Sequence, residues 1–130
     1  MPAILPPPVL EVYYSPTCTP CRLELPVLAE FVKADGGRVR IIVLDQELRA
    51  RRELHAVSPA LEKDAASHNG DKPRDVLLAA GDGDAILPFV RSILPGGKVC
   101  ARWRGRLTLS RARELVAACA RIASPARHRS

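Results

Sequence analysis

The stretch 9–44, VLEVYY SPTCTPC RLELPVLAEFVK ADGG RVRIIVL, decides the fold. Its first run is short and rich in Val and Tyr, which is typical of a β-strand. The apolar residues Leu25, Leu28 and Val32 then follow at the spacing of one helix face, and the ADGG segment ends that helix. The closing run is almost entirely apolar, which predicts an interior strand covered on both faces. Strand, helix and strand in this order predict a parallel pair with a right-handed crossover.

A C-x-x-C pair, Cys18 and Cys21, stands at the junction of the first strand and the helix. The free N–H groups and the positive dipole end of a helix favour a thiolate over a thiol at Cys18. Pro20 falls in the first turn, where its missing N–H costs nothing. Cys21 lies one turn further on, close enough to form a disulfide with Cys18.

The same pair could instead be half of a metal site or a structural bridge. A zinc site usually needs a second Cys or His pair at set spacing, and a c-type haem site needs a His where this chain has Arg22. The other two cysteines, Cys100 and Cys119, are far apart in the sequence, and no H-x-x-x-H occurs. The pattern therefore favours redox chemistry.

Composition indicates one globular domain, which we expect to span residues 9–123 of the 130. Residues 1–8 form a Pro-rich leader without the features of a signal peptide, and we expect the basic tail, residues 124–130, to be disordered. No stretch approaches the roughly 20 apolar residues of a membrane span.

Positive charge is concentrated in the last third of the chain, where residues 91–130 carry ten basic side chains and one acidic one. A nucleic-acid surface of Arg102, Arg104 and Arg106 around Trp103 is one interpretation. We prefer the solvated face of a strand and a helix, because Arg outnumbers Lys 16 to 4 along the chain and Trp103 is the only aromatic residue in this part.

The remainder of the chain predicts a helical segment over residues 45–85, then two strands and a helix. A helix over residues 45–56, a short one opened by Ser58 and Pro59, a loop at 67–73 and a helical turn at 76–80 make up the first segment. Two strand-like runs around Pro-Gly-Gly at 95–97 predict an antiparallel hairpin. Thr108 or Ser110 is expected to cap the last helix. We interpret His55 and His68 as surface residues and Cys119 as a small core residue, and leave a bridge between Cys100 and Cys119 open.

This order, βαβ, helical segment, ββα, with C-x-x-C at the first strand–helix junction, resembles the thioredoxin fold. Pro26 matches the helix kink of that fold, Leu87-Pro88 stands at its cis-proline, and Gly105 matches the glycine beside its active site. The resemblance implies an α/β protein with a central mixed sheet of four (or five) strands flanked by helices.

Within that fold, the pattern C-x-P-C-x-x-E-x-P over residues 18–26 resembles the TlpA/ResA-like thiol–disulfide oxidoreductases. Two departures stand out: Thr17 replaces the usual Trp before the first cysteine, and Val12 occupies the place of a buried acid in thioredoxins. The resemblance implies a protein thiol–disulfide oxidoreductase, in the direction of a disulfide reductase, with cytochrome c maturation as one setting. It implies the periplasm as location, or the cytoplasm if the chain is complete.

The residues and the resemblance together assign roles. Cys18 is expected to be the nucleophile and Cys21 the resolving thiol, with Glu24, or alternatively Glu11, accepting the proton of Cys21. Substrate contacts are expected from Thr17, Pro20, Leu87 and Pro88, with the Leu87 backbone pairing with an extended substrate segment.

The expected partners are a disulfide-containing protein substrate and a thiol electron donor, such as a thioredoxin or a membrane thiol–disulfide carrier. The redox-active disulfide needs no other cofactor, no metal and no nucleic acid, and a monomer is expected. An alternative function for the same cysteine pair is delivery of Cu(I).

Overall fold

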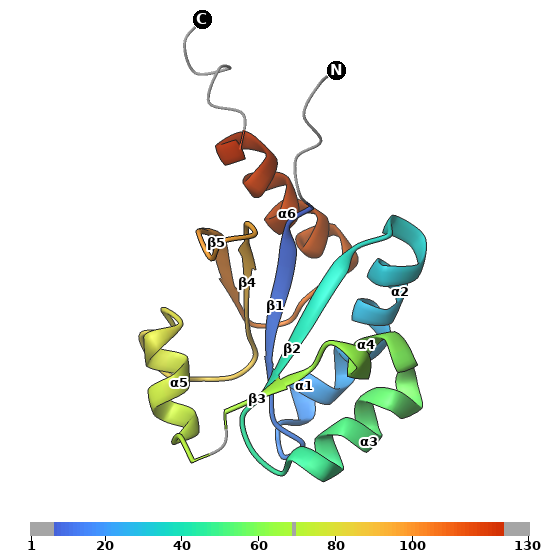
Figure 1. Ribbon diagram of the computed structural model, residues 1–130, viewed down its shortest axis with the longest axis vertical. Coiled ribbons are helices and arrows are strands. Elements are labelled where there is room, and N and C mark those ends of the chain that lie inside the picture. Colours follow the sequence, from blue (N-terminus) through green and yellow to red (C-terminus); the bar gives the residue numbers. More distant parts are fainter. Residues whose placement is uncertain (1–6, 69, 124–130) are drawn as a thin grey trace, which may run out of the picture.

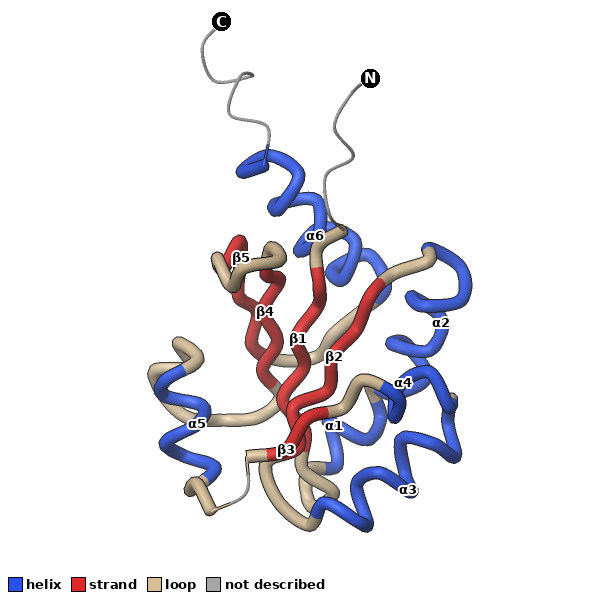
Figure 2. The backbone as a smooth tube through the Cα atoms, in the orientation of Figure 1, coloured by secondary structure: helices blue, strands red, loops and turns tan. Residues whose placement is uncertain are grey.

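The computed structural model describes residues 7–68 and 70–123. A five-stranded mixed sheet in the order β3-β2-β1-β4-β5 forms the centre, with helices around it (Figures 1 and 2). The strands are β1 (Val9–Tyr14), β2 (Arg38–Val43), β3 (Ala66–Ser67), β4 (Phe89–Ile93) and β5 (Val99–Arg104). The helices are α1 (Thr19–Leu23), α2 (Leu25–Asp35), α3 (Glu47–Val57), α4 (Pro59–Lys63), α5 (Pro73–Ala79) and α6 (Leu109–Ala123).

The strand β1 is the middle of the sheet, and all of its residues are buried. It pairs in parallel with β2, as the strand–helix–strand pattern predicts, and antiparallel with β4. Its side chains alternate between two cores. Leu10, Val12 and Tyr14 face the helices α1, α2, α3, α4 and α6, while Tyr13 faces α5. Figure 1 shows α5 apart from the other helices.

The helix after the cysteine pair is interrupted, as Pro26 predicts. A proline inside a helix removes one backbone hydrogen bond, and here the chain divides into α1 and α2 at Glu24. Gly36 ends α2 in the left-handed conformation (φ 63°), which a residue without Cβ adopts readily. The break places Glu24 at the junction of the two helices.

The hairpin β4–β5 forms around residues 95–97 and pairs antiparallel, as predicted. The Leu87–Pro88 peptide bond immediately before β4 is cis, which the resemblance implied. Gly105 ends β5 at φ 105°, a conformation that L side chains rarely adopt. Thr108 caps α6, because its Oγ1 accepts a hydrogen bond from the Arg111 N–H at 3.1 Å.

Three features of the segment 45–85 differ from the prediction. The helix α5 runs over Pro73–Ala79, so it begins inside the predicted loop at 67–73 and is longer than the predicted turn at 76–80. The interpretation as purely helical was wrong at Ala66 and Ser67, which add a fifth strand, β3, in parallel to β2. A strand of only two residues is too short to show the alternation of apolar and polar residues by which a strand is predicted. Ser58 stands at the start of α4 as predicted, but its side chain makes no capping hydrogen bond.

A second disulfide joins Cys100 at the start of β5 to Cys119 in α6. Cys119 is fully buried in the core, as its place on the apolar stripe predicted, but its sulfur is bridged rather than free. The sequence had left this bridge open, since a separation of nineteen positions says nothing about distance in space. The strand register places Cys100 at the Val9 end of the sheet, opposite the end where Cys18 follows β1.

No helix among the described residues is long and apolar enough to cross a membrane. Residues 1–6 of the predicted leader and the predicted tail lie outside the described part of the chain.

Candidate active site

Cys18 caps the N-terminus of α1. Its backbone is extended (φ −91°, ψ 100°), and its Sγ accepts a hydrogen bond from the Cys21 N–H at 3.2 Å. Pro20 lies in the first turn, as predicted. A sulfur that accepts a backbone N–H at a helix start is stabilised as an anion, because the donor and the dipole both favour negative charge.

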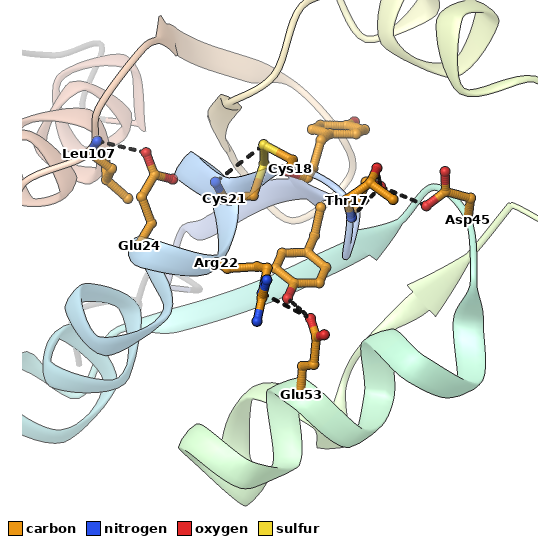
Figure 3. Close-up of a disulfide and its surroundings, with 11 residues drawn as sticks. Thr17, Cys18, Cys21, Arg22, Glu24, Asp45, Glu53 and Leu107 are labelled. Atoms are coloured by element: carbon orange, nitrogen blue, oxygen red, sulfur yellow. Dashed lines mark hydrogen bonds and ion pairs between the residues drawn. A yellow bond between two sulfur atoms is a disulfide. The ribbon is translucent and has the colours of Figure 1, made fainter.

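The two cysteines form a disulfide with a Cα–Cα distance of 5.2 Å (Figure 3). Cys21 is only 2% exposed, with its Sγ 3.9 Å from the Tyr13 carbonyl, whereas Cys18 is partly exposed. An external thiolate or disulfide can therefore reach the sulfur of Cys18 but not that of Cys21.

Glu24 is buried one turn beyond Cys21. Its Oε1 accepts a hydrogen bond from the Leu107 N–H at 2.8 Å (Figure 3). Burial raises the pKa of Glu24 from an ordinary 4.5 to about 7, and the hydrogen bond from Leu107 opposes that rise. A carboxyl group with this pKa exchanges protons readily near neutral pH. The Glu24 backbone N–H donates to the Cys21 carbonyl at 3.2 Å, but no hydrogen bond joins the Glu24 carboxylate to the Cys21 sulfur within the described residues.

Glu11, the alternative acid, lies on the wrong side of the sheet. It is buried, but it shares the face of Tyr13, whose hydroxyl donates to its carboxylate. Arg91 also donates to the same oxygen at 2.7 Å. The disulfide packs against the opposite face, where Val12 is 3% exposed and offers no acid. Alternation along β1 therefore excludes Glu11 from the proton transfer.

The four expected substrate-contact residues line two hollows beside the cysteine pair. Pro20 and Pro88 line a groove of about 580 Å³, together with Glu24 and Leu107. Thr17 and Leu87 line a smaller hollow of about 300 Å³. Thr17 is exposed, and its hydroxyl hydrogen-bonds to that of the buried Ser15 at 2.9 Å. Where Trp would offer an apolar plane, this chain presents a small polar surface.

The Leu87 backbone is open to a partner. Neither its N–H nor its C=O makes a hydrogen bond with any described residue, whereas the next carbonyl, that of Pro88, accepts one from the Gly105 N–H. An extended peptide could therefore add one or two backbone hydrogen bonds at this position.

An ion-pair network holds α1 against α3, and the sequence did not predict it. Glu53 accepts a hydrogen bond from the hydroxyl of the fully buried Tyr14 and lies 3.7 Å from Arg22, the residue after Cys21 (Figure 3). Arg49 contacts the same carboxylate at 3.1 Å. Because Tyr14 and Glu53 are thirty-nine positions apart, no local spacing reveals this contact.

The basic C-terminal third is largely occupied by internal contacts. Arg104 pairs with Asp84 and lies 3.0 Å from the buried Asp82. The Arg111 guanidinium stacks over the Trp103 ring at 3.9 Å. Stacking a base on Trp103 would require Arg111 to leave. No group of three or more potential metal ligands occurs in the part of the chain that is described.

Solved structures share this fold. No protein-family model matches the sequence, and no curated protein matches it significantly. A thioredoxin-related protein from Neisseria meningitidis serogroup B is similar at a TM-score of 0.68 and 20% identity, over 91% of this chain and 89% of that one. A secreted Mycobacterium tuberculosis disulfide oxidoreductase has a TM-score of 0.62 at 15% identity, covering 86% and 81% of the two chains. A thio-disulfide isomerase from Thermus thermophilus has a TM-score of 0.58 at 23% identity, covering 85% and 78%. The fold class predicted from the sequence is thereby confirmed.

Proposed function

We propose that this thioredoxin-fold protein catalyses thiol–disulfide exchange on protein substrates through Cys18 and Cys21. One observation carries the proposal: a disulfide at a helix start in which the capping sulfur is partly exposed and its partner is buried. This asymmetry separates an attacking thiol from a resolving thiol. The redox-active disulfide is the only cofactor that the reaction requires.

In the reducing direction the reaction has two displacements. The Cys18 thiolate attacks one sulfur of a substrate disulfide, and the other substrate sulfur leaves as a thiolate. Cys21 then attacks the Cys18 sulfur, which forms the Cys18–Cys21 disulfide and releases the second substrate thiolate. Two electrons pass from the cysteine pair to the substrate, and a separate thiol donor must return them.

Glu24 is our candidate for the proton acceptor of Cys21. A buried thiol has to lose its proton before it can attack, and Cys21, at 2% exposure, is shielded from bulk solvent. Glu24 lines the groove, and its pKa of about 7 allows both protonation states at neutral pH. Because the two side chains make no direct hydrogen bond, a water molecule in the groove would carry the proton between them.

The direction and the setting follow from the sequence pattern. Pro20 before the second cysteine resembles reducing members of the fold, so we assign a disulfide reductase, with cytochrome c maturation as one setting. A thioredoxin or a membrane thiol–disulfide carrier would return the electrons. The Cys100–Cys119 bridge supports an oxidising compartment such as the periplasm, because structural disulfides persist there.

Turnover with insulin tests the proposal. The protein should reduce insulin in the presence of a thiol donor, and Cys18→Ser should abolish that turnover. Cys21→Ser should instead accumulate a mixed disulfide through Cys18, since the resolving thiol is missing. Reduction of insulin by the Cys18→Ser variant at the wild-type rate would contradict the assigned roles.

A further inference from the structure

The groove beside the disulfide carries one positive side chain that has no ion-pair partner among the described residues. Pro20, Leu23, Val27, Pro88 and Leu107 make it mainly apolar, with Glu24 in its wall and Arg106 at its exposed rim. Leu23 is 73% exposed there, a large apolar surface to leave in water. The groove thus offers an apolar surface and a single cation to whatever binds next to Cys18.

Arg106 differs from four other arginines of the described chain. Arg22, Arg104, Arg111 and Arg113 each form an ion pair with a carboxylate. The guanidinium of Arg106 makes no ion pair or hydrogen bond with any described residue, although its backbone is held, because its carbonyl accepts a hydrogen bond from Trp103 Nε1 at 3.0 Å. The Arg106 guanidinium is thus available to a ligand, while the Arg106 backbone is held in place.

The one acid in the groove does not neutralise this cation. One carboxylate oxygen of Glu24 accepts a hydrogen bond from the Leu107 N–H (Figure 3), and no ion pair joins Glu24 to Arg106. Its raised pKa leaves it partly neutral at pH 7. An anionic group entering the groove would therefore meet Arg106 without displacing an internal partner.

We propose that Arg106 selects substrates whose reactive cysteine is flanked by an apolar residue and then an acidic one. The occupant is an extended segment of a disulfide-bonded protein that pairs with the Leu87 backbone, places its apolar side chain on the groove and brings its carboxylate to Arg106. Charge complementarity at a rim sets selectivity and association rate more than total affinity. The inference rests on the proposed exchange reaction and adds the chemistry of its substrate.

The substrate preference is tested by the rate at which the Cys21→Ser variant forms a mixed disulfide with peptides. The probes are three peptides, Glu-Leu-Cys-Leu-Glu, Gln-Leu-Cys-Leu-Gln and Lys-Leu-Cys-Leu-Lys, each with its cysteine joined to thionitrobenzoate. The Cys18 thiolate forms a bond to the peptide sulfur, and the peptide–thionitrobenzoate bond breaks with release of the coloured thiolate. The symmetric sequences present the same flanking side chains in either chain direction.

With Arg106 in place, the acidic peptide should react about fivefold faster than the basic one at low salt, which corresponds to about 1 kcal/mol for an exposed charge pair. Arg106→Gln should bring the ratio close to one, and Arg106→Glu should invert it. The matched control is Arg52→Glu, which changes net charge equally at an exposed arginine of α3 without an ion pair among the described residues. It should leave the ratio unchanged.

The outcomes separate the two proposals. Equal rates for all three peptides, or an equal effect of Arg52→Glu and Arg106→Glu, would overturn the role of Arg106 and leave the exchange reaction standing. Failure of every peptide to release thionitrobenzoate would contradict the exchange reaction itself, and the substrate preference with it.

Discussion

At the scale of single residues, the two sulfurs of the proposed active site differ by their place in α1. Cys18 caps the helix and is partly exposed, while Cys21 lies within the helix and is buried. The attacking sulfur needs both access and a stabilised anion, and only Cys18 has them. This difference exists in the fold before any substrate binds.

Glu24 gives a prediction in which stability and activity move in opposite directions. Its folded pKa of about 7 exceeds the ordinary 4.5, so the folded state holds a proton that the unfolded state has lost between these values. Stability therefore falls as pH rises from about 4.5 to about 7. Glu24→Gln keeps an acceptor for the Leu107 N–H and removes the ionisable group. In urea unfolding at pH 8, the variant should be more stable than wild type by up to about 3 kcal/mol, with no difference below pH 4.

The same variant should slow resolution of the mixed disulfide. In single-turnover reduction of insulin, the wild-type rate of the second displacement should rise through about pH 7, and Glu24→Gln should lack that inflection and run on the order of tenfold slower at pH 8. An unchanged rate profile would remove Glu24 from the proton transfer, whatever its effect on stability.

The features of the site that could be predicted depend on residues close together in the sequence, and those that could not depend on residues far apart in it. Cys18, Cys21 and Pro20 were predictable because a C-x-x-C pair at a strand–helix junction is a local pattern. The burial of Glu24 depends on Leu107, eighty-three positions away, and the lack of a partner at Arg106 depends on all of its neighbours. Such properties arise only when distant segments meet.

At the scale of elements, α1 is short and needs support from the rest of the fold. Five residues close little more than one helical turn, so its own hydrogen bonds cannot hold it. Glu53 of α3 forms an ion pair with Arg22 of α1. The same carboxylate accepts a hydrogen bond from the Tyr14 hydroxyl at the end of β1. One side chain thus connects three elements around the active site.

Removing that carboxylate contact should destabilise the fold measurably. Tyr14→Phe deletes a hydrogen bond from a fully buried hydroxyl to a carboxylate and should cost about 1.5–3 kcal/mol in urea unfolding. Glu53→Gln should cost less, because an amide oxygen can still accept from Tyr14. Arg52→Gln, at the neighbouring position of α3, is the control and should stay within about 0.5 kcal/mol of wild type. A Tyr14→Phe cost no larger than this control would show that the contact contributes nothing.

Most elements were predictable because each has its own pattern. The strand runs of β1 and β2, the glycine stop after α2 and the Pro-Gly-Gly hairpin are all local signals, and the structure confirms them. β3 was missed because its two residues form a strand only by lying beside β2. Whether an edge segment pairs is a tertiary property.

At the scale of the whole molecule, the two disulfides occupy opposite ends of the sheet. Cys18–Cys21 closes a very short loop at the reactive end, and Cys100–Cys119 ties β5 to α6 at the other. Each bridge joins a buried sulfur to a partly exposed cysteine, but only Cys18 caps a helix start, whereas Cys100 lies in β5 without a helix N-terminus to stabilise its thiolate. We therefore expect the first bridge to be reactive and the second to be structural.

Deleting the second bridge should lower thermal stability without affecting exchange. For its sequence separation of 19, chain entropy alone predicts about 3 kcal/mol, or roughly 10 °C in Tm for a domain of this size. The Cys100→Ala/Cys119→Ala variant should show this loss in calorimetry and still reduce insulin at the wild-type rate. The control, Cys18→Ala/Cys21→Ala, should lose less stability and all activity. Equal stability losses for the two pairs would contradict this division of roles.

The reactivity of the cysteines against pH tests the central claim most directly. After selective reduction of the Cys18–Cys21 bridge, alkylation by iodoacetamide is followed across pH, with the modified cysteine located by peptide mass spectrometry. A thiol at a helix start should react at Cys18 first, with a midpoint clearly below the value of about 8.5 for a free cysteine. Alkylation of Cys21 first, or a Cys18 midpoint at or above about 8.5, would contradict the account.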